Sequence, residues 1–269
     1  MVIRNISREI FESKNNDMIQ LLNNNFSNEM IEKLYFIPKK VNKEIIHKKM
    51  NDKKYLNKVI KTVSYFKDKN IEDLISKKIQ YYEKNTNTKL IGGKIYIIVG
   101  LDTTTIYSTN IDGEDVTVLL LEATNGSEDI LNILLAHEYT HFIRKQKLCK
   151  DIFESSIGER FVTEGIASNY SKEMVPYRKD SEYCIVDEET VEWVKNNMDI
   201  IEKHMIGKKN TNELMNDYFY MFADSSITGI PVRTGYVYGY LKVREYLTAN
   251  NLKVKDILGI NWETIIENQ

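Results

Sequence analysis

Hydrophobic residues recur with helical spacing through most of the first 90 positions. Apolar side chains three and four positions apart over 18–34, 41–67 and 71–82 predict three amphipathic helices. Pro38 separates the first two, because proline cannot continue a helix. We therefore expect residues 1–88 to form a helical N-terminal region, which carries no clear chemistry of its own.

The pattern changes after the polar, turn-rich stretch 85–93, where short apolar runs replace the helical spacing. Residues 94–100 and 115–123 have the β-branched composition of strands. The connection between them can hold a further short strand, and its Asp112-Gly113 pair marks a turn. Strand 115–123 has two possible places: as a core strand, or as a sheet edge to which an extended peptide could add.

A longer helix is predicted directly after these strands. Asn125-Gly126 marks a turn, and Ser127 is a suitable N-cap because acidic residues 128 and 129 follow in the first turn. One stripe of the helix carries Ile130, Leu134, His137 and His141, and basic residues 144, 145 and 147 end it.

Three further helices are expected, over 159–170, 191–205 and 234–247, followed by a capping helix over 252–266 with Trp262 packed. The small side chains of Gly165 and Ala167 would let the 159–170 helix and the 128–147 helix approach each other, and the Gly235/Gly239 pair would allow close packing on another helix. The expected fold is α+β, mostly helical, with a small β-sheet preceding the 128–147 helix. Residues 89–269 would form the second domain, which could pack with residues 1–88 as one unit.

Composition narrows the function classes only modestly. The chain of 269 residues is 42% hydrophobic and has a formal charge of −2, so it has no overall basic character of the kind that nucleic-acid binding requires. Cys149 and Cys184 do not make a disulfide framework. We see no signal-peptide core and no apolar run of membrane-spanning length, so the expectation is a cytoplasmic protein. The lysines over 39–54 are interpreted as a solvated helix face.

The chemistry is concentrated in His137-Glu138-Tyr139-Thr140-His141, an H-E-x-x-H motif. Residues four apart lie on one face of a helix, so the two imidazoles can bind one zinc ion. Glu138 would then lie close enough to take a proton from the attacking water. A catalytic zinc site needs a third ligand, and Glu164, on a helix that could cross the first, is the natural choice. The acids that compete with it are Asp151, Glu154 and Glu159.

Two more motifs accompany H-E-x-x-H, namely T-E-G-I-A at 163–167 and G-Y-V-Y-G-Y at 235–240. Together they resemble the gluzincin metallopeptidases, the thermolysin-like branch of the zincins, and most closely a bacterial family of predicted Zn-dependent proteases. The resemblance covers about residues 94–250 and implies a zincin-like catalytic domain. It implies His137, His141 and Glu164 as zinc ligands and Glu138 as general base. One departure is Ser168, which stands where thermolysin-like enzymes carry an acid that supports a ligand histidine.

The third motif offers candidates for stabilising the oxyanion that forms on an attacked carbonyl. Tyr236 and Tyr240 are the candidate phenol donors, and Arg233 is an alternative. His204 is interpreted as a surface residue. The sequence thus predicts a metallopeptidase with one Zn²⁺ per chain that acts on a peptide or protein. The alternatives are a non-catalytic, zinc-stabilised binding or regulatory module, and hydrolysis of a non-peptide amide or ester.

Overall fold

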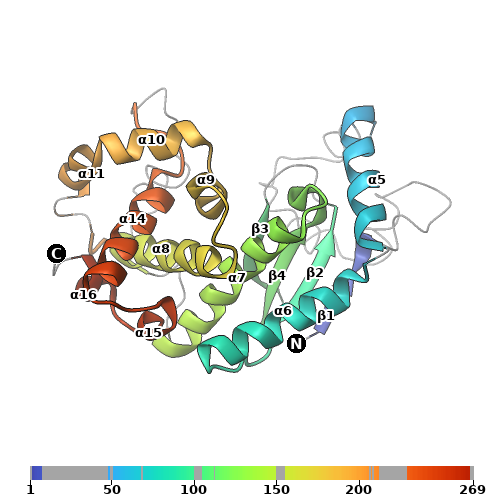
Figure 1. Cartoon of the computed structure of the whole chain (residues 1–269), viewed down its shortest axis with the longest axis horizontal. Coiled ribbons are helices and arrows are strands. Elements are labelled where there is room, and N and C mark those ends of the chain that lie inside the picture. Colours follow the sequence, from blue (N-terminus) through green and yellow to red (C-terminus); the bar gives the residue numbers. More distant parts are fainter. Residues whose placement is uncertain are drawn as a thin grey trace. The chain divides into compact units, whose positions relative to one another are not determined.

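The computed structural model describes residues 2–7, 48, 51–67, 69–99, 105–111, 113–149, 155–205, 207, 209–211 and 229–266. These residues are mostly helical and include one four-stranded sheet, which confirms the predicted α+β class (Figure 1). The chain divides into two compact units. Unit 1 comprises Met1–Lys84 and Lys89–Leu134, and unit 2 comprises Asn85–Thr88 and Leu135–Gln269. The expected domain boundary near residue 88 stays a prediction.

The sheet of unit 1 has the strand order β1-β2-β4-β3. It consists of β1 (Val2–Asn5), β2 (Lys94–Ile98), β3 (Ile106–Ile111) and β4 (Glu114–Leu120). Strands β1, β2 and β4 run parallel, whereas β3 pairs antiparallel with β4 across the turn at Gly113, whose φ is 81°. Strand β4 therefore lies inside the sheet, so its interpretation as an edge was wrong and the core-strand alternative is confirmed.

Burial explains why β2 and β4 occupy the centre. Both carry nearly unbroken runs of buried residues, as is typical of parallel strands covered on both faces. A further short strand was considered possible in the connection between β2 and β4, and β3 is that strand. Strand β1 was not predicted, because its four residues are too few to show a period of two.

The described part of unit 1 also contains the helices α5 (Lys53–Lys67) and α6 (Ile71–Thr86). The 3₁₀ turn η1 (Leu121–Thr124) and the start of α7 (Glu128–Leu148) belong to it as well. The Tyr55 hydroxyl donates to Glu122 Oε1 at 2.8 Å, and the Tyr82 hydroxyl donates to Asn132 Oδ1. These bonds join α5 to η1 and α6 to α7. The predicted 18–34 helix and the first part of the 41–67 helix lie outside the described residues.

Helix α7 begins where its capping pattern predicted, since Ser127 Oγ accepts from the Ile130 amide at 3.3 Å. In unit 2 it is followed by α8 (Ile157–Met174), which Ser156 caps in the same way. Nearly every residue of α8 from Ile157 to Ser171 is buried, so α8 is the central helix of the unit. A buried helix that carries glutamates must satisfy them internally.

Helix α14 (Thr234–Ala249) packs closely against α8. A Cβ atom at Gly239 would lie 1.9 Å from the Phe161 carbonyl oxygen, and one at Gly165 would lie 2.2 Å from the Gly239 carbonyl oxygen. The two backbones are thus in direct contact. This confirms the close packing predicted at Gly239, whereas Gly165, which was expected to let α7 approach, contacts α14. The Asn169 amide group donates to the Tyr240 carbonyl at 2.9 Å and reinforces the contact.

The remaining described helices of unit 2 are short. They are α9 (Asp180–Cys184), α10 (Glu188–Asn196), α11 (Met198–Met205), α15 (Val254–Ile257) and α16 (Trp262–Ile266). Helix α9 was not expected. The single helix predicted over 191–205 is divided at Asn197, whose φ of −134° is not helical. The capping helix predicted over 252–266 is likewise two helices. Trp262 is buried as expected and lies against Gly158 of α8.

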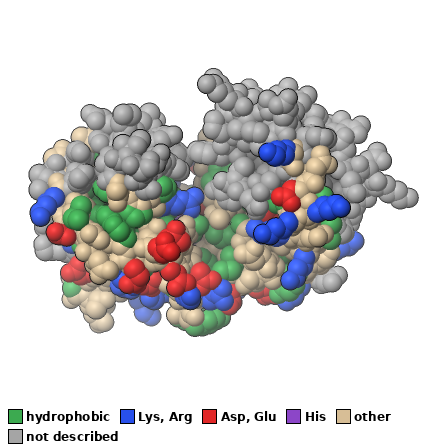
Figure 2. Space-filling view, turned by 90° about the horizontal axis from the view of Figure 1, so that it is seen from above, with side chains coloured by type: hydrophobic (Ala, Val, Ile, Leu, Met, Phe, Trp, Pro, Cys, Tyr) green, Lys and Arg blue, Asp and Glu red, His purple; other side chains and the backbone are tan. Residues whose placement is uncertain are grey.

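The described surface carries both signs of charge. On the face seen in Figure 2, Lys and Arg side chains are interspersed with Asp and Glu side chains. That face of the described residues therefore shows no continuous basic area of the kind that binds nucleic acid. Within the part of the chain that the structure describes, no helix is both long and apolar enough to span a membrane.

Candidate metal centre

The two motif histidines lie one turn apart on the unit 2 part of α7. Their ring centroids are 4.8 Å apart and the rings are nearly perpendicular, at 80°. The side chain of His137 is 3% exposed and that of His141 is 14% exposed. Two imidazoles are thus held in a nearly water-free place, where each needs a partner for its polar nitrogens.

Glu164 of α8 supplies that partner. Its Oε2 atom lies 3.0 Å from His137 Nε2 and 3.6 Å from His141 Nε2. In a tetrahedral zinc site with bonds of about 2.1 Å, any two ligand atoms are about 3.4 Å apart. The observed separations lie on either side of this value. The arrangement of two imidazole nitrogens and one carboxylate oxygen therefore fits a zinc ion, both in chemistry and in spacing.

The charges of the cluster shift the pKa values of its members in opposite directions. Burial alone would raise the pKa of Glu164, but the imidazoles of His141 and His137 outweigh it and hold the pKa well below its usual range. Burial alone would lower the pKa of His141, but the Glu164 and Glu138 carboxylates outweigh it and raise the pKa. Glu164 is thus an anion that balances positive charge placed between it and the histidines.

Glu138 follows His137 on α7 and is also buried, with 5% exposure. Its ligand oxygen and the ligand nitrogens of His137 and His141 all lie within 4.8 Å of one another. Either glutamate could therefore complete a set of three donors with the two histidines. We favour Glu164 as the ligand because its Oε2 atom lies within 3.6 Å of both Nε2 atoms, and we assign the Glu138 carboxylate to the attacking water.

The outward-facing nitrogens of the two histidines differ from the usual pattern. Among the described residues, neither His137 Nδ1 nor His141 Nδ1 has a hydrogen-bond partner, although both are buried. Metal-binding histidines usually donate this N–H to a carboxylate or carbonyl oxygen. The finding agrees with the departure at Ser168, which is buried and offers no carboxylate.

A buried ion pair next to the cluster was missed from the sequence. Arg144 was expected to end α7 as a surface charge, but it is 1% exposed, and its Nε donates to Glu159 Oε1 at 2.9 Å. The Thr163 hydroxyl also donates to Glu159 Oε1 at 2.9 Å. Glu159 is therefore occupied by Arg144. The signal was present, because Arg144 is on the stripe of His137 and His141, where a charge needs a buried partner.

The other competing acids, Asp151 and Glu154, lie outside the described residues, as does the side chain of His204.

The two tyrosines of the third motif have different surroundings. Burial raises the pKa of the Tyr236 phenol, and interaction with Glu164 and Glu138 raises it further. Its hydroxyl is therefore within electrostatic reach of the cluster. The Tyr240 hydroxyl instead donates to Asp180 Oδ1 at 2.6 Å. The structure thus engages Tyr240 in a polar network with Asp180.

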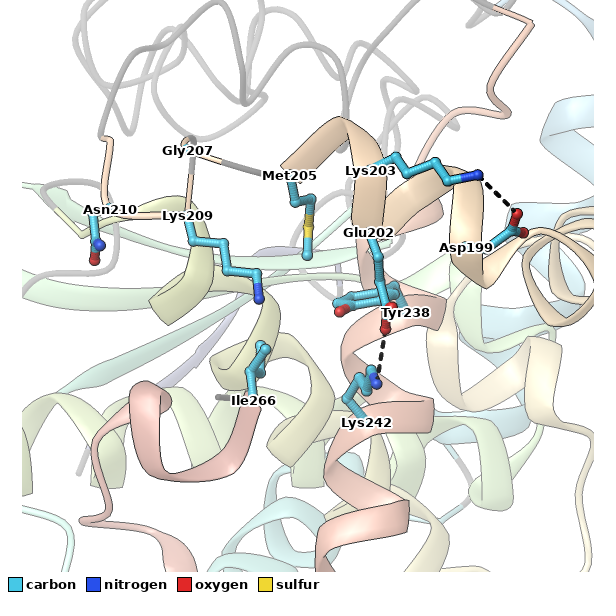
Figure 3. A pocket seen from close by; sticks show the side chains of 10 residues that line it. All are labelled: Asp199, Glu202, Lys203, Met205, Gly207, Lys209, Asn210, Tyr238, Lys242 and Ile266. Carbon is cyan, nitrogen blue, oxygen red and sulfur yellow. Dashed lines mark ion pairs between the residues drawn. The ribbon is translucent and has the colours of Figure 1, made fainter. Parts of the chain in front are cut away.

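A pocket of about 700 Å³ lies elsewhere in unit 2, against α11, α14 and α16 (Figure 3). Two ion pairs line the pocket. Lys242 Nζ lies 2.9 Å from Glu202 Oε1, and Lys203 Nζ lies 3.7 Å from Asp199 Oδ2. None of the predicted site residues lines it. Its lysines are largely neutralised by these carboxylates, so it does not compete with the His–Glu cluster as the centre of chemistry.

Comparison with known families gives one finding. Residues 63–267 match the model of a family described as "Predicted Zn-dependent protease". No curated protein and no solved structure matches the chain. The matched range includes the two motif histidines, Glu164 and Tyr236.

Proposed function

The chain belongs to this family of predicted Zn-dependent proteases, and from that premise we propose that it is a zinc metallopeptidase of gluzincin type. The observation that carries the proposal is the meeting of both motif histidines on one carboxylate oxygen of Glu164, at 3.0 and 3.6 Å. His137, His141 and Glu164 would hold the metal. When bound, zinc supplies a Lewis acid that activates water and polarises a carbonyl group.

Glu138 is the proposed general base. It precedes His141 by three positions, and its ligand oxygen lies within 4.8 Å of the ligand nitrogens of His137 and His141. A carboxylate in this position can take a proton from the attacking water and pass it to the nitrogen of the leaving amine. Because the carboxylate is buried, few water molecules compete for this proton.

Tyr236 is the proposed donor to the developing oxyanion. Its raised pKa keeps the phenol protonated at neutral pH, which a hydrogen-bond donor requires. Tyr240 is assigned a structural role instead, because its hydroxyl is held by Asp180 and Lys172. Replacing Tyr236 with Phe should lower kcat by about 10²-fold or more and leave metal content unchanged.

The deciding experiment measures zinc by mass spectrometry in wild-type protein and in two matched variants. Glu164→Gln removes a charged ligand, so we expect its zinc content to fall well below one ion per chain. Glu138→Gln should keep its zinc and lose turnover of a peptide library. A reversal of the two results would exchange the roles of Glu138 and Glu164. An active Glu138→Gln variant would exclude it as the base.

A hydroxamate probe separates an enzyme from a zinc-stabilised binding module. A hydroxamate needs an accessible coordination position, so it should bind the zinc-loaded protein and raise its melting temperature. No binding to a fully zinc-loaded protein would favour the closed, structural site. Parallel assays with amide and ester substrates test whether the bond cleaved is a peptide bond.

A further inference from the structure

Arg233 is a cation near the candidate centre that lacks a carboxylate partner. It lies directly before α14 and is half-buried. Its Nη1 donates to the Ile185 carbonyl oxygen at 2.9 Å, and its guanidinium carbon lies 5.7 Å from the centroid of the Tyr236 ring. Among the described residues it forms no ion pair, so most of its five N–H donors are available to another group.

Other arginines of unit 2 are paired with carboxylates. Arg144 pairs with Glu159, Arg178 with Glu182, and Arg244 with Asp180. The side chains of Arg178 and Arg244 are 32% and 40% exposed and could have relied on water, yet each lies within reach of a carboxylate. Arg233 is likewise of intermediate exposure, but among the described residues it has no carboxylate within reach, and this calls for an explanation by function.

The backbone that presents Arg233 is strained. Arg233 has φ 63° and ψ 19°, and Ile185, which accepts its hydrogen bond, has φ 55° and ψ 45°. Left-handed backbone is uncommon for residues other than glycine, and for a β-branched residue such as isoleucine it is an outlier. Two such residues joined by a hydrogen bond hold the guanidinium in one place. Strain of this kind persists mainly where a ligand site requires it.

Tyr236 connects Arg233 to the catalytic cluster. The guanidinium packs on the face of the Tyr236 ring, and Tyr236 lies one turn before Gly239, whose backbone contacts Gly165 next to Glu164. A substrate carbonyl that receives a hydrogen bond from Tyr236 would thus have Arg233 as a neighbour. Val232, which is 41% exposed, adds an apolar surface beside the cation.

We propose that Arg233 binds a carboxylate of the substrate and so selects peptides that carry one near the bond to be cleaved. The inference rests on the proposed function of the same site. A guanidinium matches a carboxylate with two parallel N–H···O bonds, which fixes orientation as well as charge. The carboxylate has two sources, the free C-terminus of a peptide or an Asp or Glu side chain.

The test measures binding without turnover. Zinc-loaded Glu138→Gln protein is immobilised and exposed to a pool of random tetrapeptides, synthesised once as free acids and once as C-terminal amides. Retained peptides are quantified by mass spectrometry. We expect the acid pool, or the Asp- and Glu-containing members of the amide pool, to be retained about tenfold more strongly than neutral peptides. Stronger retention of the acid pool identifies the C-terminal carboxylate as the group that is bound. Stronger retention of the Asp- and Glu-containing amides identifies the acidic side chain.

Variants in this background assign the preference to Arg233. Arg233→Gln should abolish it, and Arg233→Lys should reduce it several-fold, because an ammonium group cannot form the paired bonds. Arg178→Gln is the control, since it removes an arginine already neutralised by Glu182. A preference unchanged in Arg233→Gln overturns the proposal, as does equal retention of acidic and neutral peptides. If Arg233→Gln fails to fold, the Arg233→Lys variant decides. An unchanged preference for carboxylate-bearing peptides in that variant overturns the proposed paired contact between the guanidinium and the carboxylate.

The wild-type enzyme separates this result from the proposed function. If it cleaves none of these peptides while retention still depends on Arg233, the peptidase proposal fails and the carboxylate site remains. If it cleaves acids and amides equally and Arg233→Gln lowers both rates alike, Arg233 acts on the oxyanion and the selectivity proposal fails.

Discussion

Gly239→Ala is the most direct test of how α14 is held against α8. A methyl group at Gly239 would place its carbon 1.9 Å from the Phe161 carbonyl oxygen, whereas real Cβ atoms essentially never approach within 3.0 Å. The obstacle is backbone, which has no rotamer to change. The two helices must therefore separate by about 1 Å at their crossing point, or α8 must deform.

Two opposing effects set the size of the change. Alanine is favoured over glycine in a helix by up to about 1 kcal/mol. Forcing an extra carbon into a packed core costs about 1–3 kcal/mol and occasionally more, and a rigid backbone contact belongs at the upper end. The overlap therefore dominates, and we expect a net loss of about 2 kcal/mol. For a chain of this size that corresponds to a melting temperature lower by about 4–8 °C.

The assay is urea denaturation of metal-free protein followed by circular dichroism. Gly259→Ala is the matched control, because its Cβ would make an ordinary 3.6 Å contact with Lys147. Gly239→Ala should also lose activity beyond its unfolded fraction, since α14 carries Tyr236 and α8 carries Glu164. Stability of Gly239→Ala within about 0.5 kcal/mol of wild type would refute the close contact.

Three further outcomes are expected. Glu159→Ala should lower the free energy of unfolding by about 3–5 kcal/mol, because it leaves the buried Arg144 guanidinium unpaired; a loss below 1 kcal/mol in urea denaturation would contradict that pairing. Burial alone would raise the pKa of Asp180, but hydrogen bonds from Tyr240 and Lys172 outweigh it and lower the pKa. Asp180 therefore stabilises the fold above its unfolded pKa of about 4 and loses this effect as the pH falls further, so the melting-temperature gap between wild type and Asp180→Asn should narrow on acidification from pH 7 to pH 3. Zinc at about 100 times its Kd should stabilise the metal-free protein by about 2.7 kcal/mol, measured as a higher midpoint in urea; no shift would contradict specific binding to the folded state.

Local signals predicted most of the helical structure. Ser127 and the acids after it located the start of α7, and the Gly235/Gly239 pair indicated that another helix packs closely on α14. Such features depend on neighbours within one turn or on side-chain volume, so they can be read along the chain. The breaks near Asn197 and Gly259 escaped notice because apolar spacing continues across both.

Long-range pairing escaped prediction for a different reason. Strand β1 is defined by its partner β2, about 90 positions later, and its own four residues carry little pattern. Arg144 looked like an ordinary helix-ending charge until α8 placed Glu159 against it. In each case, the partner decides whether a residue is a surface group or a buried one.

The sequence by itself determined that two histidines and a glutamate share part of one helix, because the spacing of H-E-x-x-H and the geometry of an α-helix are enough. It could not choose among four acids for the third ligand or between two tyrosines for the oxyanion. Tertiary structure brings Glu164 to the histidines, Glu159 to Arg144, and the Tyr240 hydroxyl to Asp180. Those choices depend on where α8 and α14 cross α7 and where they cross each other. Backbone contact at glycines sets the α8–α14 crossing, and no local propensity determines it.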